Sequence, residues 1–206
     1  MFRKIKEVIN GLDIASIPKE RKEILQPLIA YIHNKRETGE EINLNFICTH
    51  NSRRSHLAQI WARVMAVNYT IKRVNCFSGG TEATALFKSI KETLEKEGFK
   101  FETIFNGENP NYHIYFSSNA KPVIGFSKTF DDSVNPTSNF AAVMTCTQAD
   151  ENCPFIIGAE KRISITYEDP KSYDNTSIET EKYQERSLQI ATEMKYVFSK
   201  IKEELV

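Results

Sequence analysis

The chain has 206 residues, 40% hydrophobic and 26% charged, a composition typical of a globular protein long enough to bury a core without disulfide or metal support. Lysine plus arginine and aspartate plus glutamate each number 27, so the formal net charge is zero. A neutral chain has no overall field that attracts nucleic acid or an anionic membrane, so any preference for anions must come from a local site.

The lengths of the apolar runs and the number of cysteines exclude further classes of protein. No segment reaches the roughly 18 consecutive apolar residues of a membrane span, and charges interrupt the first residues too often for a signal peptide. Four cysteines are too few for a disulfide scaffold in a chain of this length. We therefore expect a cytoplasmic protein without nucleic-acid or membrane partners, whose cysteines are catalytic, redox-active or structural.

Residues 1–41 have helical periodicity, which Gly11 divides into two parts. The second part is expected to form a helix capped by Ser16, and Pro27 is expected to kink or interrupt that helix. The polar stretch 34–41 indicates a linker. We predict that residues 1–41 form a helical extension packed on the main domain. The alternative is a surface for a dimer or another partner.

From residue 42 onward, short apolar segments alternate with amphipathic ones. Strands are predicted at 42–48, 71–77, 139–146 and 162–167, and helices at 57–65, 83–97 and 178–205. This alternation favours a mainly parallel sheet flanked by helices. We predict one α/β domain over residues 42–206, with a mainly parallel central sheet of about four strands.

The segment 99–136 does not follow this alternation. Residues 99–105 and 112–117 have strand character, and the turn dipeptides Asn106-Gly107 and Asn109-Pro110 lie between them. We predict a hairpin inserted into the α/β domain.

A polar loop follows the first predicted strand and precedes a helix, with the sequence Cys48-Thr49-His50-Asn51-Ser52-Arg53-Arg54-Ser55. Such a junction points several backbone N–H groups and the positive helix end at one position. A cysteine there is expected to be a thiolate, because these donors and Arg54 favour its charged form. The Arg54 fork matches two oxygens of a tetrahedral anion, and the Ser55 hydroxyl can donate to the sulfur. The residues alone leave open a buried structural cysteine beside solvated arginines.

This loop resembles that of the low-molecular-weight protein tyrosine phosphatases and the related thioredoxin-coupled arsenate reductases, which carry Cys-x5-Arg-Ser after their first strand. It matches at Cys48, Thr49, Asn51, Ser52, Arg54 and Ser55. The similarity covers about residues 42–99 and 139–205. It implies a phosphatase-like α/β fold with a cysteine nucleophile, in which the oxyanion is held by Thr49, His50, Asn51, Ser52, Arg53 and Arg54.

A second group of residues begins at the end of the third predicted strand: Cys146, Cys153-Pro154 and Asp169-Pro170. Phosphatases of the family keep the Asp-Pro, whose aspartate protonates the leaving oxygen, but they generally lack the cysteine pair. The thioredoxin-coupled arsenate reductases carry Cys-x6-Cys-Pro followed by Asp-Pro, and this chain resembles them at all of these positions.

The resemblance implies a relay of three thiols. Cys48 attacks arsenate, Cys146 then attacks Cys48 and releases arsenite, and Cys153 attacks Cys146. The final disulfide is left for thioredoxin, and Asp169 acts as the general acid. The polar stretch between the second and third cysteines suits a segment that moves during the relay. The alternatives are thiols without a partner, or a zinc site, although the cysteine and histidine spacings are not usual for zinc.

Three positions depart from the family or stand apart from the relay. His50 replaces a glycine, which would strain the loop if that position needs positive φ, and its imidazole could contact the oxyanion. Arg53 adds a second positive charge that we expect to point to solvent and tighten anion binding. Cys76 lies in an apolar strand and is expected to be a structural core residue.

Some reductases hold a potassium ion near this loop, and only Asn51 and Ser78 match that site here.

The function predicted from the sequence is arsenate reduction by the cysteine relay, with arsenate or phosphate as the bound anion and thioredoxin as the reductant. One alternative is a low-molecular-weight phosphatase that hydrolyses phosphate monoesters through a phosphocysteine intermediate. Another is a redox-sensing or anion-recognising protein without turnover. No cofactor is expected apart from the weakly indicated potassium ion.

Overall fold

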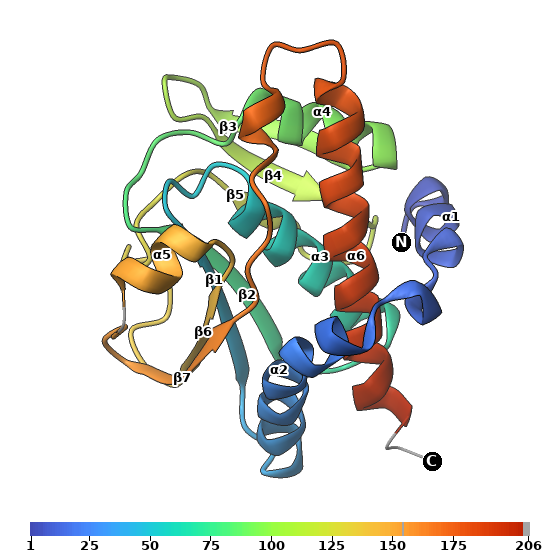
Figure 1. The fold of residues 1–206 in the computed structure, drawn as a ribbon, viewed down its shortest axis with the longest axis vertical. Helices are drawn as coiled ribbons and strands as arrows, with labels where there is room; N and C mark the ends of the chain where they lie inside the picture. The colour runs from blue at the N-terminus through green and yellow to red at the C-terminus, as the bar shows by residue number, and fades with distance from the viewer. Residues whose placement is uncertain (154, 204–206) are drawn as a thin grey trace.

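A computed structural model describes residues 1–153 and 155–203. Its centre is a sheet of strands β1 (Ile42–Cys48), β2 (Val74–Gly80), β6 (Phe140–Met144) and β7 (Ala159–Ser164). The strand order is β2-β1-β6-β7 and each neighbouring pair is parallel, which confirms the predicted α/β fold (Figure 1). Because all four strands are parallel, their carboxyl ends meet at one edge of the sheet, where ligands bind in open α/β folds.

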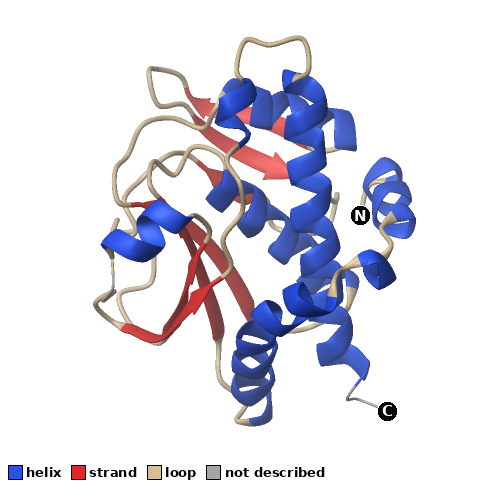
Figure 2. Ribbon diagram, in the orientation of Figure 1, coloured by secondary structure: helices blue, strands red, loops and turns tan. Residues whose placement is uncertain are grey.

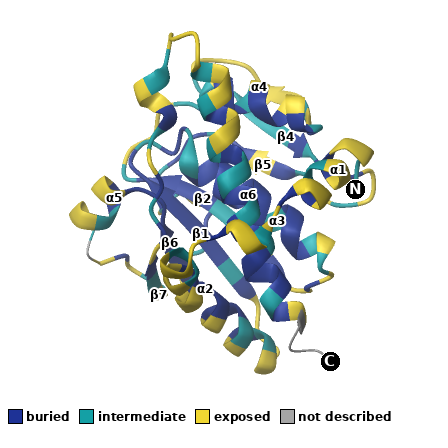
Figure 3. Ribbon diagram, turned by 45° about the vertical axis from the view of Figure 1, so that its right-hand side comes forward, coloured by how far each residue is buried: buried dark blue, intermediate teal, exposed yellow. Residues whose placement is uncertain are grey.

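Helices flank this sheet. The bounds are α3 (Arg54–Asn68), α4 (Lys88–Glu97), α5 (Thr147–Asn152) and α6 (Glu179–Glu203). The long α6 packs on α3 and α4, and buried residues fill the space between these helices and the sheet (Figure 3). At the centre of this core, Trp61 meets the Phe99 ring edge-on at 5.3 Å between centroids. In the described part of the chain, no helix combines the length and apolar character needed to cross a membrane.

The N-terminal segment forms α1 (Arg3–Gly11), a short 3₁₀ turn (Ile14–Ser16) and α2 (Lys19–Glu37). The predicted cap is wrong, since α2 begins after Pro18 and the Ser16 hydroxyl donates to the Asp13 carbonyl instead. Pro27 does not interrupt α2, because the helix buries an apolar face that stabilises it despite the lost hydrogen bond. The predicted linker is correspondingly shorter, since α2 extends to Glu37.

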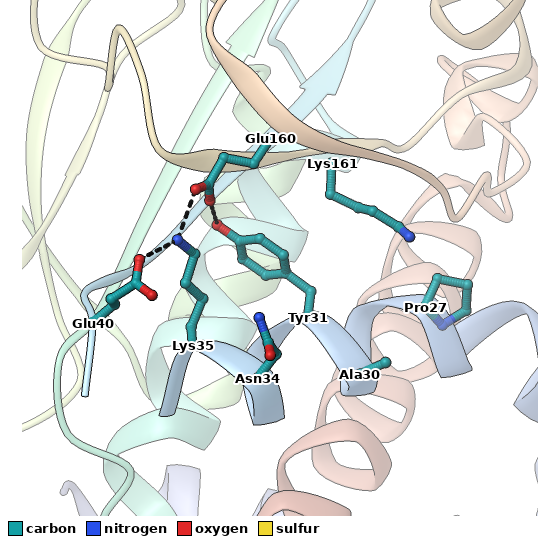
Figure 4. A pocket seen from close by; sticks show the side chains of 8 residues that line it. All are labelled: Pro27, Ala30, Tyr31, Asn34, Lys35, Glu40, Glu160 and Lys161. Atoms are coloured by element: carbon teal, nitrogen blue, oxygen red, sulfur yellow. Dashed lines mark hydrogen bonds and ion pairs between the residues drawn. The ribbon is translucent and has the colours of Figure 1, made fainter. Parts of the chain in front are cut away.

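The N-terminal helices share the main hydrophobic core. The buried side chains of Ile5, Leu25 and Ile32 belong to the same cluster as Trp61. Polar contacts also fix α2 against the edge strand β7, where Glu160 accepts hydrogen bonds from the Tyr31 hydroxyl at 2.8 Å and the Lys35 ammonium at 2.7 Å (Figure 4). The edge of the sheet at β7 is therefore contacted by α2.

Between α4 and β6 the chain forms a second sheet, set apart from the first (Figure 2). As predicted, β3 (Lys100–Phe105) and β4 (Asn111–Tyr115) pair in an antiparallel hairpin. A third strand that the sequence analysis missed, β5 (Val123–Gly125), joins the other side of β4.

Several predicted boundaries are wrong, although the order of the elements is right. β2 begins at Val74 instead of residue 71, and β7 covers Ala159–Ser164 instead of 162–167. The helix predicted over 83–97 begins only at Lys88, and α5 lies in the polar stretch between Cys146 and Cys153, for which no helix was predicted. The final helix matches within the described residues.

Candidate active site

Cys48 is the last residue of β1, and α3 begins at Arg54, so the loop between them lies at the carboxyl edge of the sheet. The first turn of α3 therefore directs its free N–H groups and positive dipole end toward the loop. Cys48 is buried, with 4% of its surface exposed, and its Sγ lies 3.0 Å from the Ser55 Oγ. The contact predicted between the cysteine sulfur and this hydroxyl is present.

Asn51 fixes the shape of the loop. It adopts a φ of 44°, in the left-handed region that asparagine tolerates, and it is fully buried. Its Nδ2 donates to Ser55 Oγ at 2.9 Å, while its Oδ1 accepts the Lys128 N–H at 3.0 Å. The concern that His50 would need positive φ is thus misplaced, since the strained position is one residue later. His50 is partly exposed, with its Nε2 3.8 Å from the Glu82 carboxylate.

Residues 81–87 run along the loop and bind its backbone. Thr81 and Glu82 donate their N–H groups to the carbonyls of Cys48 and Thr49 at 3.1 and 2.9 Å. The Ser52 hydroxyl donates in return to the Ala85 carbonyl at 2.7 Å. The N–H groups of Thr81 and Glu82 and the carbonyl of Ala85 thus form hydrogen bonds with the loop and are not available for helical hydrogen bonds. This explains why α4 starts later than predicted.

Gly80 permits this close approach. A Cβ at this position would lie 2.6 Å from the Thr49 carbonyl oxygen and 2.7 Å from the Asn51 nitrogen. Any larger residue would push the loop away from β2, so glycine is required here for steric reasons.

Arg54 and Asp169 meet across the mouth of the loop. The Arg54 NH1 donates to the Tyr167 carbonyl at 2.9 Å, and its NH2 forms an ion pair with the Asp169 carboxylate. The Arg54 Nε is buried without a hydrogen-bond partner among the described residues, so one donor is available for an anion. Asp169 also caps the 3₁₀ turn Pro170–Tyr173 through the Lys171 N–H.

Arg53 does not point to solvent, contrary to our expectation. Its Nε donates to the Tyr183 hydroxyl at 2.6 Å and its NH2 contacts Asp174 at 2.6 Å. The guanidinium also lies 3.9 Å from the centroid of the Phe87 ring. Sequence reasoning missed Asp174, Tyr183 and Phe87, because nothing in their local pattern marks them.

Cys146 lies next to the loop at the end of the neighbouring strand. The Thr145 N–H donates to the Ile47 carbonyl at 2.7 Å, which places the following cysteine beside the end of β1. Cys146 caps α5, accepting the Ala149 N–H at 3.4 Å, and its Sγ is 3.4 Å from the Thr49 hydroxyl. Its burial is nearly complete, with 1% exposed.

Cys153 ends α5 and is half-buried, with its N–H bound to the Ala149 carbonyl at 3.1 Å. Pro154, which completes the predicted Cys-Pro pair, is outside the described residues. The three thiols share one small apolar cluster, which includes Ile47, Phe140 and Met144. All four cysteines are free thiols.

Cys76 is partly buried and packs against the other, larger cluster. Burial raises the pKa of its thiol to about 12, which fits the predicted structural role.

The side of the loop that faces β2 contains buried basic groups. His56 is fully buried with its Nδ1 3.4 Å from Ser78 Oγ, and burial together with the Lys128 charge lowers its pKa to about 3. Burial likewise lowers the pKa of Lys128 to about 8. Asn51 and Ser78, the two residues that matched the potassium site, already contact Lys128 and His56. Potassium binding at this position stays a prediction from the resemblance.

Within residues 1–153 and 155–203, no group of three or more histidine, cysteine, aspartate or glutamate side chains is arranged to hold a metal.

Comparison with known proteins adds evidence on the fold. No protein-family model and no curated protein sequence matches the chain. Among solved structures, a low-molecular-weight phosphotyrosine phosphatase from Vibrio cholerae O395 matches with a TM-score of 0.52 at 14% identity, over 80% of this chain and 98% of that chain. An arsenate reductase in its phosphate-binding state gives 0.50 at 16% identity, over 78% and 98%. A low-molecular-weight protein tyrosine phosphatase from T. tengcongensis gives 0.51 at 17%, over 80% and 99%. The chain therefore has the fold of these proteins.

Proposed function

We propose that this chain is an arsenate reductase that uses Cys48 as nucleophile and passes oxidation through Cys146 to Cys153, for reduction by a thioredoxin-type dithiol. The observation that carries the proposal is the position of Cys146. It is a buried thiol at the end of the strand beside β1, in the same apolar cluster as Cys48 and linked to the loop through Thr49. A phosphatase has no use for a second thiol at that position.

In the first step, the loop holds the arsenate dianion. Backbone N–H groups of residues 49–54 and the Arg54 guanidinium surround its oxygens, and the hydroxyls of Thr49 and Ser52 line the same loop. The Cys48 thiolate attacks arsenic and forms a sulfur–arsenic bond, while the arsenic–oxygen bond to the hydroxyl group of the dianion breaks. This hydroxyl leaves as water after accepting one proton from the protonated Asp169 carboxyl group. Arg54, which bonds to Asp169 in the free protein, transfers at least part of its fork to the anion. Arg53 anchors the loop to Asp174 and Tyr183 during this step.

In the second step, Cys146 supplies the reducing electrons. Its thiolate attacks the Cys48 sulfur, the electron pair of the sulfur–arsenic bond moves to arsenic, and arsenite departs as As(III). A Cys48–Cys146 disulfide remains. The Ala149 N–H already donates a hydrogen bond to the Cys146 sulfur at the start of α5.

In the third step, Cys153 attacks Cys146, which frees Cys48 as a thiolate and leaves a Cys146–Cys153 disulfide. These residues flank the six residues of α5, so seven helical steps separate their Cα atoms by about 10 Å. A disulfide requires Cα atoms within about 7 Å, so α5 must unwind. The disulfide is then reduced by the partner, whose dithiol is oxidised in exchange.

A second candidate is phosphate-monoester hydrolysis through a phosphocysteine. The contact between Arg54 and Asp169 supports it, because it brings an anion-binding group next to a carboxylate that can serve as general acid once it is protonated. This reaction needs neither Cys146 nor Cys153.

The experiment measures NADPH oxidation by the purified protein with arsenate, thioredoxin and thioredoxin reductase. We expect arsenate-dependent turnover that is lost in Cys48→Ser, Cys146→Ser and Cys153→Ser but kept in the control Cys76→Ser. Turnover confined to aryl phosphates, requiring Cys48 alone among the cysteines, would replace the reductase with the phosphatase. Anion binding without turnover of either substrate would identify a sensor or binding protein and overturn both.

A further inference from the structure

Tyr167 connects the main parts of the candidate site through its backbone. Its N–H donates at 3.1 Å to the carbonyl of Thr145, the residue before Cys146. Its own carbonyl accepts the Arg54 NH1 at 2.9 Å, and Asp169 follows two residues later. A shift of this one residue would therefore displace the arginine fork and the proton donor together.

The side chain of Tyr167 is held by a residue of the N-terminal segment. The Arg21 guanidinium, from the first turns of α2, lies 4.8 Å from the centroid of the Tyr167 ring. The same guanidinium makes two hydrogen bonds of 2.8 Å with the Glu193 carboxylate of α6. Such a paired, bidentate contact fixes the plane of the guanidinium, and a cation over an aromatic face attracts it.

All three side chains are shielded from water, which strengthens these contacts. The Glu193 side chain is 3% exposed, the Arg21 side chain is 16% exposed, and Tyr167 is buried. Burial of the Tyr167 hydroxyl, with the nearby Glu193 charge, raises its pKa well above the usual value, so the ring is neutral.

The helix that carries Arg21 is itself fixed at its other end. Tyr31 and Lys35 bind Glu160 on β7, and the side chains of Leu25, Leu28 and Ile32 are buried in the core (Figure 4). Arg21 therefore projects from a helix held at both ends, and it can resist movement of the ring that it covers.

We infer that Arg21 is a positioning residue of the active site: acting through the Tyr167 ring, it keeps Arg54 and Asp169 in place at the Cys48 loop. The inference rests on the proposed function, because it assigns Arg21 a part in that chemistry. It makes the N-terminal helix part of the catalytic apparatus.

A purely structural role is the competing explanation, in which Arg21 only ties α2 to α6. The chain offers a matched control for it. Arg36, near the other end of α2, donates to the Ile201 carbonyl of α6 at 2.6 Å, and among the described residues it makes no hydrogen bond or ring contact with Tyr167. Loss of Arg36 weakens the same pair of helices without touching the site.

The test compares Arg21→Met/Glu193→Gln, Arg21→Lys and Arg36→Met in the full chain. The double variant avoids leaving Glu193 as a buried, unpaired carboxylate. Hydrolysis of phenyl phosphate and of dinitrophenyl phosphate is measured for each variant, because only the poorer leaving group needs protonation by Asp169. Arsenate turnover, phosphate affinity and Tm are measured in parallel.

For the double variant we expect kcat to fall about threefold with dinitrophenyl phosphate, because a displaced Arg54 holds the anion less well in both reactions. With phenyl phosphate we expect a fall of about tenfold or more, because a displaced Asp169 also protonates the leaving oxygen poorly. The affinity of the double variant for phosphate should weaken. Arg21→Lys, which keeps the positive charge, should lose less phenyl phosphate hydrolysis than the double variant. Arsenate turnover should fall most in the double variant and less in Arg21→Lys. Arg36→Met should keep wild-type kinetics.

Equal losses with both esters would show that Asp169 is not held through Tyr167, and an equal loss in Arg36→Met would make the role of Arg21 merely structural. Either result would overturn the inference alone. A wild-type protein that turns over neither ester nor arsenate would overturn the proposed function, and the role of Arg21 with it.

Discussion

At the scale of single residues, Glu97 is an ionisable group buried in the core. It is 2% exposed at the end of α4, and its carboxylate accepts the Ser187 hydroxyl at 2.8 Å. Ser187 in turn accepts the Trp61 N–H at 3.0 Å. Burial raises the pKa of Glu97 to about 8, so the folded protein keeps this proton at neutral pH.

This raised pKa predicts a stability that falls as pH rises. Below about pH 4.5 both the folded and unfolded forms are protonated, and Glu97 carries no penalty. Between about 4.5 and about 8 the unfolded chain loses the proton while the fold retains it, so the free energy of unfolding decreases with pH. Glu97→Gln removes this slope. We expect the variant to gain on the order of 2–4 kcal/mol over wild type between pH 4.5 and 8.5.

Urea unfolding followed by the fluorescence of Trp61, the single tryptophan, measures this difference at both pH values. The exposed Glu95→Gln on the same helix serves as control and should change little. A gap between wild type and Glu97→Gln that is the same at pH 4.5 and 8.5 would contradict the prediction.

The residues of the anion loop show how far sequence reasoning reaches at this scale. The contact between Cys48 and Ser55 follows from strand–loop–helix geometry, and the structure contains it. The contacts of Arg53 with Asp174 and Tyr183 could not be foreseen, because these partners lie 121 and 130 residues away along the chain. Long-range pairs between polar residues leave no periodic signal in one sequence.

At the scale of elements, α5 is the part of the candidate site that must change shape. Asp150, inside the helix, holds it against β7 through a 2.6 Å ion pair with Arg162 and a 2.7 Å hydrogen bond from the Ser164 hydroxyl. A six-residue helix has little stability of its own, so these tertiary contacts set how often it opens.

Asp150→Ala should therefore speed formation of the Cys146–Cys153 disulfide. Loss of a partly exposed ion pair and one hydrogen bond lowers the opening free energy by about 1 kcal/mol, which corresponds to a roughly fivefold faster rate. The measurement is mass spectrometry of alkylated protein after a timed exposure to diamide. Hydrolysis of aryl phosphates, which needs no opening of α5, should be unchanged.

The exposed Glu151→Ala on the same helix provides the control, with an unchanged oxidation rate expected. If Asp150→Ala and Glu151→Ala oxidise at the wild-type rate, α5 opens without breaking its contacts to β7, and the proposed unwinding is wrong.

Helices and strands were predictable where the local sequence pattern determines their bounds. The apolar run of β1 is buried along nearly its whole length, so its bounds match the prediction at both ends. The start of α4 was wrong, because residues 81–87 satisfy their backbone groups on the Cys48 loop. α5 was missed because its short polar sequence resembles a loop, and its cap is a cysteine thiol.

At the scale of the whole molecule, the N-terminal segment and the α/β domain are joined by one hydrophobic core. The cluster contains Ile5, Leu25 and Ile32 together with Trp61 and Ile190 of the main domain. Helical periodicity predicted these N-terminal helices and their packing on the domain. It could not predict that Arg21 would reach Tyr167, because that contact depends on where α2 is placed in three dimensions.

This shared core predicts that residues 42–206 do not keep the native fold alone. Each fully buried leucine or isoleucine contributes about 1.5–3 kcal/mol, so the loss of Ile5, Leu25, Leu28 and Ile32 approaches the whole stability of a typical domain, about 5–15 kcal/mol. Removal of α2 would also expose the β7 edge and the face of α6 that α2 covers. We expect the truncated chain to aggregate or to lack a cooperative thermal transition, measured by circular dichroism and size-exclusion chromatography.

The matched control is Ile32→Ala in the full chain, which removes one of the same buried side chains while keeping α2. It should fold and unfold cooperatively with a free energy of unfolding lower by about 2–5 kcal/mol. A truncated chain that is monomeric and melts near the wild-type Tm would show instead that the segment is an independent appendage. If the segment is such an appendage, α2 is not fixed to the main domain and Arg21 cannot hold Tyr167 in place. The truncated chain, which lacks Arg21, should then have the same kinetics as the full protein. The truncation thus links the stability of the whole molecule to the geometry of its site.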